Sequence, residues 1–79
     1  MDYKVTDLPV DLHHEDMVDV GGGVVVRFET NGEAKDVYLG EAFTPTVQLF
    51  PACDYTFEAG GCSYKLTALF EDKLRVEKI

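Results

Sequence analysis

A β-hairpin around the dipeptide Asn31-Gly32 constrains the fold of this chain more than any other feature of its sequence. Residues 24–30 are rich in β-branched and aromatic side chains, and residues 33–39 return with a similar alternation of apolar and polar side chains. Asn-Gly between two such segments is typical of a two-residue type I′ turn. The sequence therefore predicts an antiparallel pair of strands at this point of the chain.

The turn also predicts the register of this hairpin. Val26 would lie opposite Val37, and Arg27 would lie opposite Asp36 as a pair of opposite charges. Because side chains alternate between the faces of a strand, a slip of one residue would move every apolar side chain to the other face. The predicted apolar face consists of Val24, Val26, Phe28, Val37 and Leu39.

A second hairpin is predicted around Gly60-Gly61, between residues 53–59 and residues 62–70. The same pairing rule places Phe57 opposite Tyr64 on an apolar face that also carries Cys53. Cys53 and Cys62 would then lie on the order of 20 Å apart along the hairpin. A disulfide needs Cα atoms closer than about 7 Å, so we expect two free thiols.

A third turn is predicted at residues 71–73, with Phe70 opposite Leu74 on the apolar face of the returning strand. Arg75 and Glu77 would point outward from that strand. Since three turns join consecutive strands, the sheet is expected to be antiparallel.

The remaining elements are shorter. The sequence predicts a strand at residues 47–50, between Pro45 and Pro51, and an edge strand at residues 3–6. One helical turn is expected at residues 11–17, capped by Asp11. The expected fold is one all-β domain over residues 1–79, an antiparallel sheet of about five to six strands curled into a barrel or a sandwich.

The net charge of −8, from fifteen acidic and seven basic residues, limits the possible partners. It disfavours direct binding to nucleic-acid phosphates or to anionic membranes, and it favours a basic protein surface. Carboxylates two residues apart on one strand face lie about 6–7 Å apart, which is similar to the spacing of neighbouring phosphates. The predicted partner-binding residues, all expected to face outward, are Glu29, Asp36, Tyr38, Asp54 and Glu58.

The acidity has a second interpretation. Two carboxylates about 7 Å apart in water repel by only about 0.6 kcal/mol, and salt weakens that repulsion further. A protein can therefore carry this charge for solubility alone.

No catalytic residue, metal ligand or cofactor is predicted. The run from His13 to Asp16, with Asp19 nearby, offers imidazole and carboxylate groups, but its spacing matches no strong metal motif, and a polar surface loop is the preferred interpretation. The glycines at residues 21–23 precede a strand and lack the following Lys-Ser/Thr of a phosphate-binding loop. We expect a binding protein and not an enzyme.

In size and charge alone, the chain is similar to phage-encoded anti-restriction and anti-CRISPR proteins that mimic DNA. This resemblance implies an inhibitor that blocks a basic, nucleic-acid-binding surface of a partner protein. The alternative is a structural or assembly module that oligomerises or docks through a β edge and an outer patch of Tyr38 and Val25. The start of the chain lacks the pattern of a secretory signal, so we expect a cytoplasmic protein, in the host cytoplasm if the source is viral.

Overall fold

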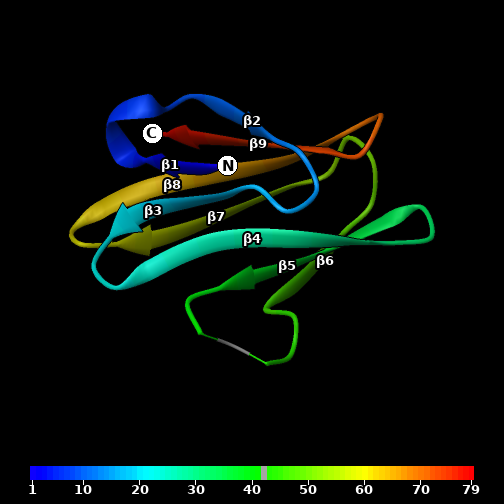
Figure 1. Ribbon diagram of the computed structural model, residues 1–79, viewed down its shortest axis with the longest axis horizontal. Helices are drawn as coiled ribbons and strands as arrows, with labels where there is room; N and C mark the ends of the chain where they lie inside the picture. Colours follow the sequence, from blue (N-terminus) through cyan, green and yellow to red (C-terminus); the bar gives the residue numbers. More distant parts are fainter. Residues whose placement is uncertain (42) are drawn as a thin grey trace.

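Two β-sheets packed face to face form the protein (Figure 1). The structure is a computed structural model that describes residues 1–41 and 43–79. In chain order, its elements are β1 (Asp2–Lys4), a 3-10 turn η1 (Val5–Asp7), β2 (Val10–Leu12), β3 (Met17–Gly21), β4 (Val24–Asn31), β5 (Ala34–Leu39), β6 (Val47–Leu49), β7 (Asp54–Ala59), β8 (Cys62–Leu69) and β9 (Lys73–Lys78).

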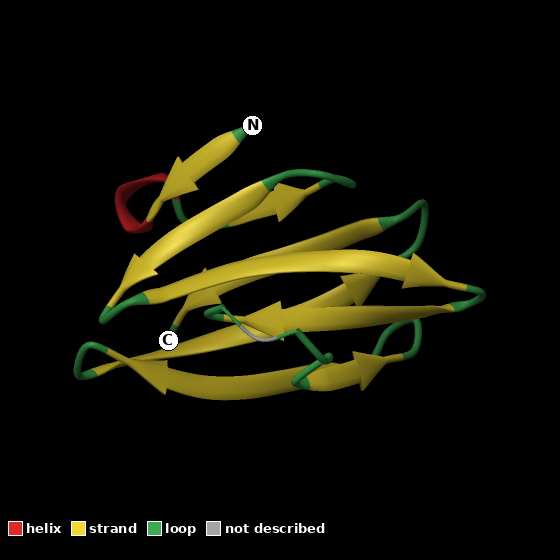
Figure 2. Cartoon of the chain, turned by 60° about the horizontal axis from the view of Figure 1, so that its bottom comes forward, coloured by secondary structure: helices red, strands yellow, loops and turns green. Residues whose placement is uncertain are grey.

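The larger sheet has the strand order β1-β3-β4-β5-β6, and the smaller sheet has the order β2-β9-β8-β7. β1 runs parallel to β3, and every other pair is antiparallel. Figure 2 shows the strands in two layers, joined by loops and turns, with the 3-10 turn η1 drawn in red beside them. The all-β expectation is confirmed, and the architecture is a sandwich. The described part of the chain has nine strands, more than the expected five to six, and one of them, β2, lies where a helical turn was expected.

The core lies between the two sheets and draws alternate residues from both. Val26 and Val37 of the larger sheet and Leu66 and Leu74 of the smaller sheet are fully buried. Each such side chain contributes about 1.5–3 kcal/mol relative to an exposed position. The alternation of apolar residues in the sequence therefore corresponds to the inward faces of the sandwich.

Two buried polar side chains cross from one sheet to the other. The Tyr64 hydroxyl on β8 donates to the Val20 carbonyl on β3 at 3.1 Å. The Lys35 ammonium on β5 donates to the Leu69 carbonyl on β8 at 2.7 Å, and Lys35 is only 3% exposed. Because a buried polar group is costly without a partner, both contacts stabilise one relative placement of the sheets.

The register of the first hairpin differs from the prediction by two residues. Val26 lies opposite Leu39, and Glu29, not Arg27, lies opposite Asp36. The paired strands end at Asn31 and Ala34, so the turn is formed by Gly32 and Glu33, with Gly32 at φ +65°. Glycine at the first central position is typical of a type II′ turn. A shift of two residues keeps every side chain on its predicted face.

Side-chain pairing accounts for this register. It brings Phe28 opposite Val37, an aromatic and β-branched pair in the core, where the predicted register would have placed Phe28 opposite Lys35. It also places the Arg27 guanidinium over the Tyr38 ring, 4.1 Å from the ring centroid.

The second hairpin has the predicted register, with Phe57 opposite Tyr64 and their rings stacked at 5.4 Å between centroids. Both cysteines are free thiols, as expected. The prediction of an inward Cys53 is wrong. Cys53 precedes β7, in a turn where Ala52 has a φ of +68°, and its side chain is exposed.

Two further predictions are wrong. The β8–β9 turn begins one residue earlier than expected, so Leu69 pairs with Lys73, and Phe70 lies in the turn with 71% of its surface exposed. Residues 11–17 form no helical turn, because Val10–Leu12 pairs with β9 as a strand. The one short helical turn among the described residues lies earlier, at Val5–Asp7.

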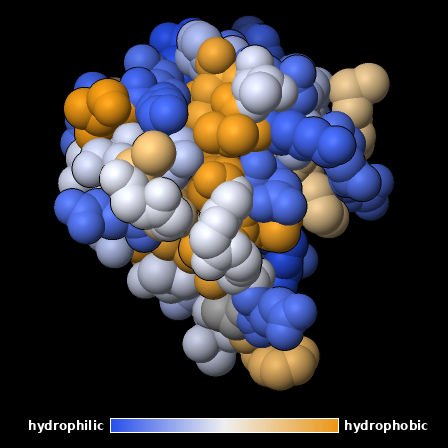
Figure 3. Space-filling view, turned by 90° about the vertical axis from the view of Figure 1, so that its left-hand side faces the viewer, coloured by the Kyte–Doolittle hydropathy of each residue, from blue (hydrophilic) through white to orange (hydrophobic). Residues whose placement is uncertain are grey.

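Two turns meet at one end of the sandwich, where Gly22 between β3 and β4 lies against Gly60 between β7 and β8. A Cβ atom on Gly22 would lie 2.6 Å from the Gly60 backbone nitrogen, which is closer than packed atoms can approach. Figure 3 shows this end of the molecule, where a band of hydrophobic residues runs between hydrophilic ones. Val24 at the start of β4 and Leu39 at the end of β5 are half-buried and pack against the core.

The contact between the turns predicts unequal effects for two neighbouring alanine substitutions. Gly22 and Gly23 both have left-handed φ values, but only Gly22 has an atom within 4 Å of the added Cβ position. We expect Gly23→Ala to lower the free energy of unfolding by about 1–2 kcal/mol, the usual cost of a left-handed alanine. Gly22→Ala should lower it further. Urea unfolding of both variants measures the difference, and equal losses would contradict the contact.

Candidate binding surfaces

The five predicted partner-binding residues lie on two different sheets. Glu29, Asp36 and Tyr38 occupy the outer face of the larger sheet, on β4 and β5. Asp54 and Glu58 occupy the outer face of the smaller sheet, on β7. Because the inner faces of both sheets share one core, their outer faces point away from each other. These residues therefore form two separate groups and not one surface.

Tyr38 points outward as predicted but does not form an exposed patch with Val25. The ring is only 9% exposed, and the Arg27 guanidinium covers it. Val25 is half-buried. Because this cation–π contact between Arg27 and Tyr38 lies within the protein, Tyr38 offers little surface to a partner.

Glu29 and Asp36 lie directly opposite each other on neighbouring strands. Like charges in this position destabilise a sheet by about 0.2–1 kcal/mol. The Asp36 carboxylate accepts hydrogen bonds from the Asn31 side-chain amide at 3.3 Å and the Gln48 side-chain amide at 3.0 Å. These neutral donors hold the carboxylate in place without cancelling its charge.

Further carboxylates surround this pair at one end of the sandwich. Glu15 and Glu29 line the same open hollow of about 310 Å³, beside the β2–β3 loop, together with the basic Arg27. Thr30, next to Glu29, donates from its hydroxyl to the Asp72 carboxylate at 3.5 Å, which brings the β8–β9 turn against β4. We call this group the acidic end; it consists of Glu15, Glu29, Glu33, Asp36, Glu71 and Asp72.

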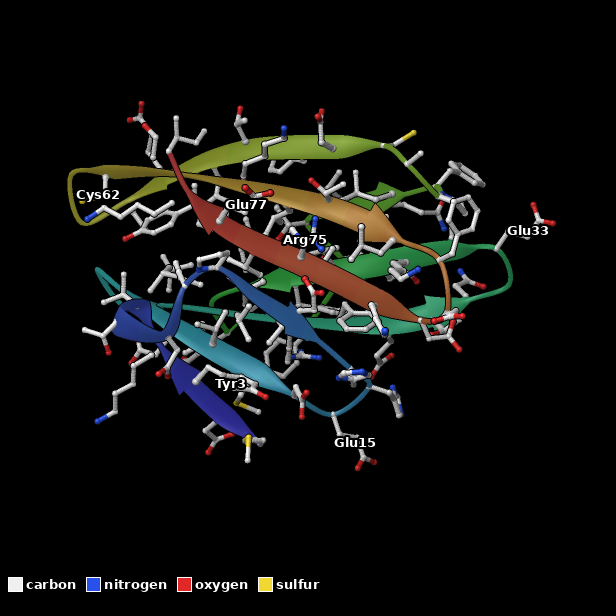
Figure 4. All side chains as sticks on the ribbon, turned by 90° about the horizontal axis from the view of Figure 1, so that it is seen from above. Tyr3, Glu15, Glu33, Cys62, Arg75 and Glu77 are labelled. Atoms are coloured by element: carbon white, nitrogen blue, oxygen red, sulfur yellow. The ribbon has the colours of Figure 1, made fainter. Side chains whose placement is uncertain are left out.

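Figure 4 shows how two members of the acidic end project from the body of the molecule. Glu33 lies at the tip of the β4–β5 turn, and Glu15 lies on the loop before β3. Both side chains are exposed. Among residues 1–41 and 43–79, no lysine or arginine nitrogen lies within 4.0 Å of the carboxylates of Glu33, Asp36 or Asp72.

The sequence pattern does not indicate four of these six residues, because alternation predicts the faces of strands and not the positions of turns. Glu15, Glu71 and Asp72 have left-handed φ values of 72°, 65° and 58°. Aspartate adopts a left-handed φ more readily than most residues, whereas glutamate has no comparable preference for it. No feature of the sequence indicates that turns from both sheets meet at this end.

Basic side chains compensate several carboxylates of the smaller sheet. Arg75 donates to both Asp11 oxygens, at 2.9 and 3.4 Å. The Lys65 ammonium lies 3.6 Å from Asp54, and the Lys73 ammonium lies 3.7 Å from Glu71. The hydrogen bond from Arg75 lowers the pKa of Asp11, and the same contact raises the pKa of Arg75.

The histidine region holds an ion pair. Asp16 accepts hydrogen bonds from the terminal ammonium at 2.9 Å and from the His13 backbone N–H at 3.0 Å, and these contacts lower its pKa. His13 Nδ1 lies 3.6 Å from the same carboxylate. Within the described ranges, no three His, Cys, Asp or Glu side chains are grouped as metal ligands would be.

Comparisons with models of protein families, with curated proteins and with solved structures found no match. In the part of the chain that the structure describes, no helix has the length and hydrophobicity of a membrane span.

The contact between Asp11 and Arg75 predicts a pH-dependent contribution to stability. The folded pKa of Asp11 lies below its ordinary value of 3.8, so the contact stabilises the fold above that pH and is lost as the pH falls through the lowered pKa. We expect Asp11→Asn to lower the free energy of unfolding by roughly 0.5–1 kcal/mol near neutral pH, since the pair is partly exposed.

Urea unfolding at a series of pH values tests this. The difference between wild type and Asp11→Asn should shrink below about pH 4. Glu41→Gln is the control, because it removes the same charge in the β5–β6 loop, away from Arg75. A difference between wild type and Asp11→Asn that is independent of pH would contradict the assignment.

Proposed function

We propose that this protein is a small acidic binding protein that blocks a basic, nucleic-acid-binding surface of a partner protein. The net charge of −8 supports a basic partner. The acidic end gives this charge a location, because six carboxylates from the turns and strands of both sheets gather there. Basic grooves that bind phosphates present lysine and arginine side chains, so the acidic end would occupy such a groove in place of nucleic acid.

The observation that carries this proposal is the direct opposition of Glu29 and Asp36 on neighbouring strands. A register that placed Arg27 opposite Asp36 would have removed the repulsion. Instead the fold keeps two negative charges side by side, and lysine or arginine residues of a partner would relieve the repulsion on binding. The repulsion that lowers the stability of the free protein would therefore strengthen its binding to a basic partner.

A cytoplasmic location belongs to the same proposal, and it is the host cytoplasm if the source is viral, as the resemblance in size and charge implies. Cys53 and Cys62 are free thiols, which suits a reducing compartment. The assembly alternative loses its Tyr38 component, because Arg27 covers that ring. Its other component, an exposed β edge, depends on different residues.

Neutralising the opposed pair should change stability and binding in opposite directions. In the single variant Glu29→Gln, we expect the free energy of unfolding to rise by about 0.2–1 kcal/mol because the cross-strand repulsion is gone. In Glu29→Gln/Asp36→Asn the rise should be smaller or absent, because asparagine leaves one of the Asn31 and Gln48 amides without an acceptor oxygen. The same variant should bind a basic partner more weakly. The matched control is Asp54→Asn/Glu58→Gln, which removes the same two charges from the other sheet.

Binding is measured as competition. Purified basic DNA-binding proteins are mixed with a labelled short DNA duplex, and this protein is added at low and at high salt. Wild type and the control variant should displace the duplex at low salt, Glu29→Gln/Asp36→Asn should displace less, and salt should weaken all three. Equal displacement by the two variants would mean that the net charge of the protein, and not the position of its carboxylates, determines binding. Displacement that ignores salt, or its absence for every basic protein tested, would contradict the proposal.

A further inference from the structure

β7 is the longest edge strand of the sandwich. Its residues Asp54–Ala59 pair only with β8, whereas the other edge strands of the described chain, β1, β2 and β6, have three residues each. β7, coloured yellow-green, runs along one margin of the molecule in Figure 4. Short edges resist the addition of another strand, and lysine, proline or a bulge protects longer ones. β7 contains neither lysine nor proline, and its pairing with β8 is regular.

The backbone of β7 presents hydrogen-bonding groups on its open side. The Ala68 N–H donates to the Cys53 carbonyl at 3.0 Å, so the carbonyl of Cys53 points toward β8. In an antiparallel ladder, alternate residues bond to the same neighbour. Tyr55, Phe57 and Ala59 therefore bond to β8, and the N–H and C=O groups of Asp54, Thr56 and Glu58 point away from the sheet.

The side chains of β7 give this edge a definite chemical pattern. Asp54, Thr56 and Glu58 are exposed on the outer face. Tyr55 and Phe57 face the core but are only half-buried, because they lie on the last strand of the sheet. On the outer face, Lys65 of β8 lies opposite Thr56, and its ammonium is 3.6 Å from the Asp54 carboxylate in a partly exposed pair. An added strand would therefore meet Glu58 and the Asp54–Lys65 pair on one face and two aromatic rings on the other.

This pattern disfavours a second copy of the chain as the added strand. In the antiparallel two-fold pairing that joins residues 54–58 of the two copies, Thr56 would lie opposite itself. Asp54 of each copy would then lie opposite Glu58 of the other, which creates two like-charge pairs at once. The acidic outer face thus acts against self-pairing while leaving the backbone groups available to a strand of opposite charge.

We propose that β7 binds an extended segment of a partner protein that carries lysine or arginine at positions i and i+4 and apolar residues at i+1 and i+3. The basic residues would lie opposite Asp54 and Glu58, and the apolar residues would pack beside Tyr55 and Phe57. This mode is β-strand addition, in which the backbone supplies affinity and alternate side chains supply specificity. The site goes beyond the proposed function, because it uses neither the acidic end nor the larger sheet.

A pair of synthetic peptides tests the pattern. The probe is Ser-Lys-Val-Thr-Val-Lys-Ser, labelled and followed by fluorescence anisotropy and by amide chemical shifts of the protein. The control, Ser-Lys-Val-Val-Lys-Thr-Ser, has the same composition but places its lysines on opposite strand faces. We expect the probe to bind at least about tenfold more tightly than the control, with shifts centred on residues 54–58. Equal binding of the two peptides would overturn the proposal.

Variants of the protein separate this site from the acidic end. Asp54→Asn/Glu58→Gln should weaken binding of the probe about tenfold, and Glu29→Gln/Asp36→Asn should leave it unchanged. Thr56→Pro removes an N–H that points away from β8, so the hairpin keeps its own hydrogen bonds while the probe loses one. If Thr56→Pro does not fold, the variant Asp54→Lys/Glu58→Lys takes its place in the test. That variant should bind a form of the probe in which glutamate replaces both lysines.

Sedimentation completes the test. The wild-type chain should remain a monomer under conditions where it binds the probe. A dimer that Thr56→Pro abolishes would show that the occupant of the edge is a second copy, and would overturn the proposal. Failure of the peptide to bind, together with displacement of DNA by the acidic end, would reject this site and leave the proposed function standing.

Discussion

The buried hydrogen bond from the Lys35 ammonium to the Leu69 carbonyl is the constraint on which the arrangement of the sandwich depends. A lysine that is 3% exposed cannot keep its full hydration, so it needs a protein acceptor at a fixed distance. Leu69 supplies that acceptor from the opposite sheet. The hydroxyl of Tyr64 makes the reciprocal contact with Val20 nearer the other end. Because the two bonds run between sheets, they fix how one sheet lies on the other in a way that apolar packing alone does not.

The faces of the strands could be predicted from the sequence, but the register could not always be. Alternation has a period of two, so it distinguishes a slip of one residue and is blind to a slip of two. Gly60-Gly61 allowed one pairing that satisfied both strands, and that prediction was correct. Around Asn31-Gly32, two registers keep the apolar side chains on the inner face. The contacts of Phe28 with Val37 and of Arg27 with Tyr38 favour the register that the Asn31-Gly32 dipeptide does not indicate.

The grouping of charged residues was harder to predict, because it depends on pairings between distant parts of the chain. Alternation correctly places Glu29 and Asp54 on outer faces, but it does not say that β4 and β7 belong to different sheets. The acidic end arises only when the β8–β9 turn lies beside β4, as the contact of Thr30 with Asp72 shows. Turn residues that look unrelated in the sequence become neighbours through the stacking of the sheets.

The two ends of the sandwich differ in chemistry, which has a physical consequence for any encounter. The acidic end lies at the β4–β5 and β8–β9 turns, and the hydrophobic band of Figure 3 lies at the opposite end, between hydrophilic residues. The molecule measures 32 Å along its longest axis, so the two features face in different directions. A partner that engages the acidic end therefore leaves the hydrophobic band open to solvent or to a second molecule.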